Sequence, residues 1–161
     1  MPDVNLTDIA MRLVAAIIVG GALGADREWR GKPAGVRTLA LVALGAALVC
    51  VTAMHLDVLR ADPNATSRVV QGIIQGVMTG VGFLGAGAVM RSLDQREAHN
   101  LTTAATVWVT AALGIACGLA AWSVVWIGVG LTLIVLVVLQ PIDTWFDKRR
   151  KDSRSPDKLT K

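Results

Sequence analysis

Long apolar stretches alternate with short clusters of charge along the chain. Residues 9–25 are apolar except for Arg12, and residues 38–56, 69–90 and 98–142 contain no Asp, Glu, Lys or Arg. A helix needs about 20 residues to cross a bilayer. Each of the first three stretches therefore holds one helix, and the fourth, with 45 residues, holds two. The segment 118–122 is the expected turn between those two helices.

This pattern predicts an all-α, polytopic membrane protein with five transmembrane helices, at about residues 9–25, 38–56, 69–90, 101–118 and 122–140. The period-2 alternation of a membrane barrel is absent. A soluble helical bundle is the alternative, but a chain of 161 residues is too short to surround so many apolar helices with polar ones. We expect residues 1–146 to form one transmembrane domain and residues 147–161 to form a basic cytoplasmic tail.

The distribution of basic residues predicts the orientation in the membrane. Five spans place the two termini on opposite sides, with three basic residues on the side of the N-terminus and 13 on the other. The positive-inside rule makes the side with 13 cytoplasmic, so the N-terminus faces out and the C-terminus faces in. This topology explains the net charge of +4. No basic module with interleaved aromatic residues is present, so we expect the lipid bilayer and no nucleic acid as a partner.

Small residues recur at intervals of four in three of the predicted helices. Close approach of helices in lipid requires such residues. The rows are Ala16, Gly20 and Gly24; Gly72, Gly76 and Gly80; and Thr106, Thr110, Gly114 and Gly118. Each row alone is compatible with packing inside the chain. Three rows in so short a chain favour self-association, so we expect a homo-oligomer such as a dimer.

A denser cluster of glycines, Gly80, Gly82, Gly85 and Gly87, falls at the end of the third predicted helix. Each glycine costs a helix about 1 kcal/mol relative to alanine. We therefore expect a break in the helix here, or a backbone that lies directly against another helix or a ligand.

Polar segments from four predicted helices meet at the cytoplasmic side, which predicts a ligand or partner site. Besides the glycine cluster, its residues are Asp26, Arg27 and Glu28 after the first helix; Arg37 and Thr38 at the start of the second; and Asn100, Thr102 and Thr103 at the start of the fourth. Asn100 is expected to be the N-cap of that helix.

Asp26 lies at a helix C-terminus, where negative charge is unfavourable. Arg27, Arg37 or a bound cation or partner protein could offset this charge, and an ion pair with Arg37 that ties two helices together is the structural interpretation. Asp26 is accordingly the candidate metal ligand, with Mg²⁺ as a bound or transported ion. No catalytic Ser/His/Asp set, phosphate-binding loop or zinc-ligand cluster is visible, so we expect neither an enzyme nor a cofactor.

Four segments together resemble the MgtC/SapB family. They are GADREWRGKPAGVR at 24–37 followed by Thr38, GVGFLGAG at 80–87, LTTAATVWV at 101–109, and residues 112–118. The resemblance implies a multi-pass protein of the bacterial inner membrane with a five-helix domain, here without the soluble C-terminal domain of many relatives. It also implies a role in adaptation to low magnesium and, in pathogens, in survival inside host cells.

Carried over by position, the acidic residue that follows the family's first helix falls on Asp26, where Glu is usual. Arg27, Glu28, Arg37 and Thr38 match the family pattern. Leu39 stands where the family often has His, and Asn100 replaces a common Gly.

Three functional hypotheses follow. The first is a regulator that modulates other inner-membrane proteins, which the absence of an ionisable residue in the middle of any span favours. The second is a transporter of magnesium or another cation, with Asp26, Glu28 and backbone carbonyls near residues 80–87 as ligands. The third is a purely structural membrane module.

Overall fold

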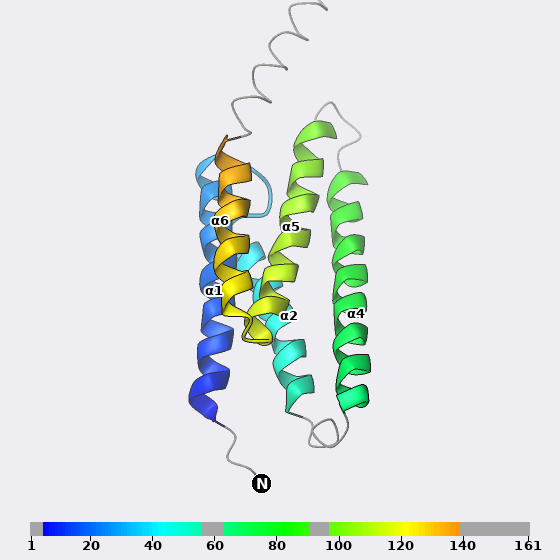
Figure 1. Cartoon of the computed structure of the whole chain (residues 1–161). Helices are drawn as coiled ribbons and strands as arrows, with labels where there is room; N and C mark the ends of the chain where they lie inside the picture. Colours follow the sequence, from blue (N-terminus) through cyan, green and yellow to red (C-terminus); the bar gives the residue numbers. More distant parts are fainter. Residues whose placement is uncertain (1–4, 56–62, 91–96, 139–161) are drawn as a thin grey trace, which may run out of the picture.

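The computed structural model describes residues 5–55, 63–90 and 97–138, and these form an all-helical bundle. Its helices are α1 (Leu6–Trp29), α2 (Val36–Met54), α4 (Pro63–Met90), α5 (Glu97–Gly118) and α6 (Trp122–Val138). They run up and down along one axis, so that consecutive helices are antiparallel (Figure 1). We call the end where α1 finishes the Arg27 end, and the end where α1 begins the Arg12 end. The prediction of five helices is confirmed for the described part of the chain.

The helices extend beyond the apolar stretches that predicted them. α1 continues to Trp29, α4 begins at Pro63 and α5 begins at Glu97. Asn100 therefore lies inside α5, and the prediction that it caps the helix is wrong. Charged and polar residues next to an apolar stretch can continue the helix. Hydropathy shows which side chains prefer lipid, but it does not show where the backbone hydrogen bonds of the helix end. Residues 139 and 140 of the fifth predicted span lie outside the described residues.

α5 is the central helix and contacts each of the other four helices. In its apolar stretch Leu101–Gly118, 61% of the residues are buried, compared with 11% in the most apolar 18-residue stretch within Asn64–Val89 of α4. α4 lies at the edge of the bundle, where it packs mainly on α5 and less on α2 (Figure 1). One broad face of α4 is consequently open.

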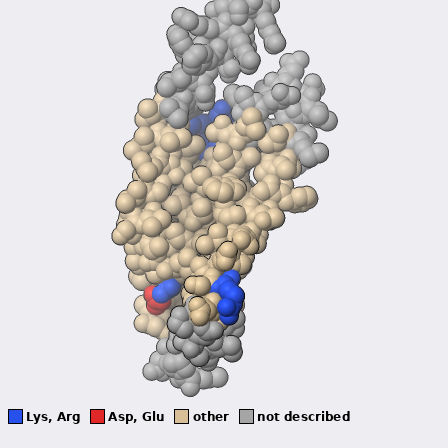
Figure 2. Space-filling model, turned by 45° about the vertical axis from the view of Figure 1, so that its right-hand side comes forward, with Lys and Arg blue, Asp and Glu red and all other residues tan. Residues whose placement is uncertain are grey.

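The outside of the bundle is apolar between its two ends. Large side chains such as Ile18, Leu41, Phe83, Trp126 and Leu131 are all more than half exposed. On the face seen in Figure 2, the charged side chains lie at the two ends and the body between them carries none. α1, α2, α4 and α5 are long and apolar enough to cross a membrane, whereas α6 is a shorter apolar helix of 17 residues. Such a surface is compatible with a membrane protein, since it would be unfavourable in water.

Glycines bring α1 and α5 into backbone contact with α2. A Cβ added at Gly20 would lie 2.8 Å from the Ala40 Cα, and one at Gly24 would lie 2.5 Å from the Val36 Cα. Likewise, a Cβ at Gly118 would lie 2.6 Å from the Cys50 Cβ. Only glycine permits this spacing, so α1, α2 and α5 form a tightly packed core.

The turn predicted at 118–122 is present between α5 and α6. Residues 119–121 connect the two helices, and the Ala121 N–H donates to the Ala116 carbonyl at 2.9 Å. Ala120 has a positive φ of 55°, as in a left-handed helix cap.

Candidate functional site

Arg27 is buried at the end of the bundle, with only 2% of its surface exposed. Its Nε and Nη2 atoms donate to the Pro33 carbonyl at 3.2 and 3.0 Å. Nη1 donates to the Thr106 hydroxyl at 3.1 Å, and Nη2 also donates to the Thr103 hydroxyl. We call Arg27, Pro33, Thr103 and Thr106 the Arg27 node. It joins α1 and the α1–α2 loop to the central helix α5.

All these hydrogen bonds from Arg27 go to neutral oxygens. The Thr106 hydroxyl donates its own proton to the Thr102 carbonyl at 2.7 Å, which leaves its lone pairs free to accept from Arg27. A positive charge thus lies among neutral acceptors at the Arg27 end. Arginine suits this position because its guanidinium is planar and reaches several acceptors at once.

The burial of Arg27 follows from the register of α1. The buried residues of this helix recur at the alternating intervals of three and one that mark a single helix face: Ala16, Val19, Gly20, Leu23, Gly24 and Arg27. Because α1 continues past residue 25, Arg27 lies one turn after Leu23 on the same face. Arg27 was predicted from the sequence as a site residue, but beyond the end of the first helix. Extending the apolar stripe by one turn would have indicated its burial.

The Asp26 carboxylate forms an ion pair with Arg30, with 2.8 Å between the Arg30 Nε and an Asp26 oxygen. The predicted pair between Asp26 and Arg37 is therefore wrong. Arg30 lies one turn further along, which is the favoured spacing for a pair on one helix. Arg37 is instead exposed in the first turn of α2, as is Thr38.

Glu28 caps the start of α2 from outside that helix. Its Oε2 accepts a hydrogen bond from the Val36 N–H at 3.0 Å. The N-cap position itself is Gly35, which has no side chain to accept one. A carboxylate at a helix N-terminus also interacts favourably with the helix dipole. Arg27 and Glu28 together hold both sides of the α1–α2 loop.

Replacing Glu28 with Gln should lower the free energy of unfolding by about 0.5 kcal/mol, because the hydrogen-bond acceptor stays while the charge at the α2 N-terminus is lost. Glu28→Ala should lose about 1 kcal/mol, because it removes the cap as well. Unfolding in mild detergent, followed by circular dichroism, measures both changes. Asp26→Asn is the matched control, since that carboxylate does not cap α2. A Glu28→Ala variant as stable as the wild type would contradict the capping role.

The structure does not bring together all of the predicted site residues. Thr103 belongs to the Arg27 node, whereas the Thr102 side chain is exposed. The Asn100 side chain lies outside the described side chains. α4 is an unbroken helix through the glycine cluster, so the expected break is wrong. Gly85 lies near Ala104, with 3.3 Å between a Cβ added there and the Ala104 Cβ, but Gly80, Gly82 and Gly87 face open space.

Within residues 5–55, 63–90 and 97–138, no three His, Cys, Asp or Glu side chains gather as they would around a metal ion. Asp26 and Glu28 each already bind a group of the protein. An ion bound at Asp26 would have to compete with Arg30 for the carboxylate.

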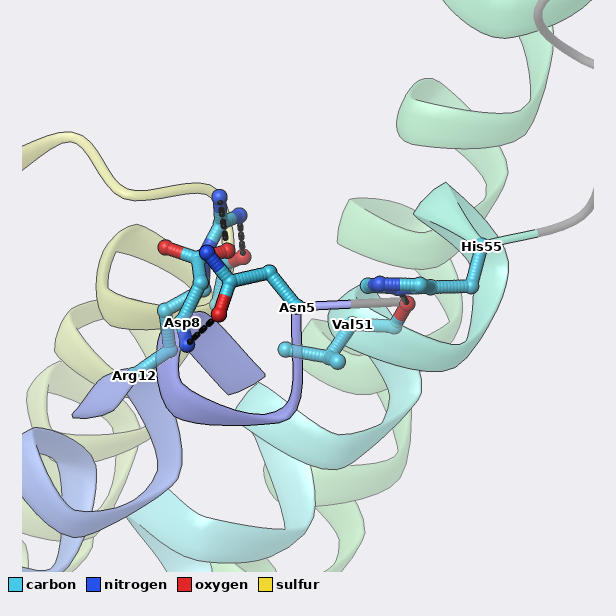
Figure 3. A network of polar contacts seen from close by, with 6 residues as sticks. Asn5, Asp8, Arg12, Val51 and His55 are labelled. Carbon is cyan, nitrogen blue, oxygen red and sulfur yellow. Dashed lines mark hydrogen bonds and ion pairs between the residues drawn. The ribbon is translucent and has the colours of Figure 1, made fainter. Parts of the chain in front are cut away.

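A second polar cluster lies at the Arg12 end (Figure 3). Arg12 forms an ion pair with Asp8 at 2.7 Å, and its Nη1 donates to the Gly118 carbonyl at 3.0 Å. This bond satisfies a carbonyl at the C-terminus of α5, which the helix itself leaves without a partner. α1 therefore holds the central helix at both ends, through Arg12 and Arg27.

Comparison with known proteins identifies several relatives. The sequence profile of the MgtC family matches residues 13–145. Protein SrpB of Synechococcus elongatus is 40% identical over 144 residues, which are 84% of this chain and 77% of that protein. Protein MgtC of Salmonella typhimurium is 40% identical over 109 residues, covering 68% of this chain and 42% of MgtC. The protein named putative magnesium transporter YhiD of Escherichia coli is 36% identical over 142 residues, covering 84% of this chain and 62% of YhiD. No solved structure matches this chain.

Proposed function

The chain belongs to the MgtC family, and on that premise we propose that it acts in bacterial magnesium homeostasis by regulating another inner-membrane protein. In this proposal the protein crosses the inner membrane several times, and its Arg27 end lies at the cytoplasmic leaflet. A role connected with magnesium is supported by the relative named putative magnesium transporter YhiD. The chain spans 42% of the length of MgtC of Salmonella typhimurium.

The observation that carries the proposal is the buried charge of Arg27. A cation crossing the core between α1, α2 and α5 would pass the guanidinium, which is bound there only to neutral oxygens. Like charges repel strongly where water is excluded. In addition, α2, α4 and α6 contain no Asp or Glu, and α5 contains only Glu97. A cation path usually requires such groups within the membrane.

The exposed residues at the Arg27 end offer a surface to a regulated partner. Arg37 and Thr38 point outward from the first turn of α2, next to a loop that Arg27 and Glu28 hold in place. A rigid polar surface at the membrane boundary is suited to protein contact, since little entropy is lost on binding. The regulated protein would be an inner-membrane transporter or enzyme that responds to magnesium supply.

A magnesium transporter is the second candidate. It is favoured by Asp26, whose side chain is 19% exposed at the Arg27 end, and by the name given to YhiD. Magnesium keeps several of its waters and needs only one or two carboxylates, so a sparse site of this kind is chemically sufficient.

Magnesium flux into liposomes tests the choice between the two. We expect purified protein to give no uptake above empty liposomes, while an established magnesium channel reconstituted in parallel gives a clear signal. Uptake that is lost in Asp26→Asn would identify a transporter and refute the regulatory proposal.

A growth assay at low magnesium tests the regulatory role directly. A strain that lacks the protein should grow poorly, and the wild-type chain should restore growth. Arg37→Glu should fail to restore it at equal protein level, because the reversed charge lies on the proposed partner surface. Leu41→Ala, one turn further along the same helix, is the control and should restore growth fully. Unimpaired growth of the deletion strain at low magnesium would contradict the proposed function.

A further inference from the structure

The small residues of α4 lie on a face that no part of the described chain covers. A Cβ added at Gly72, Gly76 or Gly80 would meet no heavy atom within 4 Å. The corresponding glycines of α1 and α5 lie directly against α2. Each glycine destabilises a helix by about 1 kcal/mol relative to alanine. On α1 and α5 this cost is offset by packing inside the chain, whereas on α4 it is not.

A row of unsatisfied polar side chains runs beside these glycines. Gln71, Gln75 and Thr79 follow at intervals of four, are exposed, and form no hydrogen bond in the described part of the chain. The threonines at 106, 110 and 132, in contrast, each donate to the carbonyl four residues before them. Gln71 and Gln75 also line a groove of about 460 Å³ along the N-terminal half of α4.

The position of this row in the span makes it informative. Residues 71–79 occupy the middle of the candidate membrane span Asn64–Val89. Hydrocarbon cannot hydrogen-bond to an amide, and burying one there without a partner costs several kcal/mol. This face of α4 combines uncovered glycines with amides that lack hydrogen-bond partners. Within the membrane, such a face should therefore be covered by another protein surface that can form hydrogen bonds.

We propose that this surface is α4 of a second copy of the chain, packed across a two-fold axis perpendicular to the membrane. Two copies inserted in the same orientation are related by such an axis, which places each residue opposite its own counterpart at the same depth. An amide both donates and accepts, so Gln75 pairs with Gln75 of the partner subunit while Gly76 permits close approach of the helices. Residues 69–89 carry no charge, so the face matches itself better than it matches a charged partner.

Disulfide cross-linking in native membranes tests the proposal, in a chain with Cys50→Ala and Cys117→Ala to remove the two buried native thiols. We expect Gln75→Cys to give a cross-linked dimer on mild oxidation. Ile127→Cys is the matched control, because Ile127 lies on α6 and is 64% exposed. Equal cross-linking at both positions, monomer at both, or a cross-link from residue 75 to a different protein would overturn the proposal.

A pair of glycine substitutions gives an independent test. Gly76 and Gly45 both lie in helices, and a Cβ added at either would meet nothing within 4 Å, so we expect a leucine at either position to leave the monomer folded. Gly76→Leu should lower the dimer fraction about tenfold or more, since the helices can no longer approach. Gly45→Leu should leave it unchanged, and an equal loss in both variants would contradict an α4 interface. The inference rests on the membrane location proposed above but not on the magnesium role, because a dimer in membranes would stand even if growth at low magnesium were unaffected.

Discussion

Arg27→Met is expected to lower the free energy of unfolding by about 2–4 kcal/mol, one of the two largest effects predicted for a single substitution in this chain. The guanidinium makes its hydrogen bonds to a loop carbonyl and to two hydroxyls of α5, and methionine fills part of the volume but makes none of them. The Pro33 carbonyl then loses its partner, so the α1–α2 loop should loosen with it. Protease sensitivity of the loop and unfolding in mild detergent measure the two consequences.

Arg27→Lys distinguishes the contribution of the positive charge from that of the planar guanidinium. Lysine keeps the positive charge but lacks the planar fork that reaches Pro33 and both threonines, so we expect an intermediate loss of stability. Arg30→Met is the control at the end of the same helix, since it removes a partly exposed ion pair with Asp26 and should cost less than about 1 kcal/mol. If Arg27→Met were as stable as Arg30→Met, the Arg27 node would have no role in holding the bundle.

Gly24→Ala is expected to destabilise the fold by about 2–3 kcal/mol, although it adds a single methyl group. That methyl would lie 2.5 Å from the Val36 Cα and 2.7 Å from the Val36 nitrogen. Both atoms belong to the backbone of α2, so the contact cannot be relieved by a change of rotamer. α1 and α2 would have to separate, which would also displace Glu28 from its cap.

The control for Gly24→Ala should change stability in the opposite direction. At Gly45, also in a helix, an added Cβ meets nothing within 4 Å. Gly45→Ala should therefore stabilise the protein by about 0.5–1 kcal/mol, through helix propensity and a less flexible unfolded chain. Thermal unfolding of the two variants in one detergent compares them directly. Destabilisation by Gly45→Ala, or tolerance of Gly24→Ala, would contradict the packing described here.

The site at the Arg27 end could be predicted only in part. Arg27, Glu28 and Thr103 were named from the sequence and do lie together around the α1–α2 loop. The partner of Asp26 was misassigned, because charge pattern along the chain does not show whether a pair forms within one helix or between two. The glycine cluster at 80–87 was expected either to break its helix or to lie against another helix or a ligand. α4 is continuous through it, and Gly85 lies near Ala104 of α5. Helix propensity is a weak prior, and neighbouring residues with strong apolar character sustain the helix.

Local properties of the chain, namely runs of apolar residues between charge clusters and contiguous motifs, were enough to predict the five helices of the described residues and the family. Which small residues pack inside the bundle became clear only from the folded structure. Gly20, Gly24, Gly114 and Gly76 have equivalent spacing, but the first three lie against α2 and the last faces outward. The burial of Arg27 was decided in the same way. Which face of a helix is covered depends on neighbours that are distant in sequence, and periodicity alone carries no information about them.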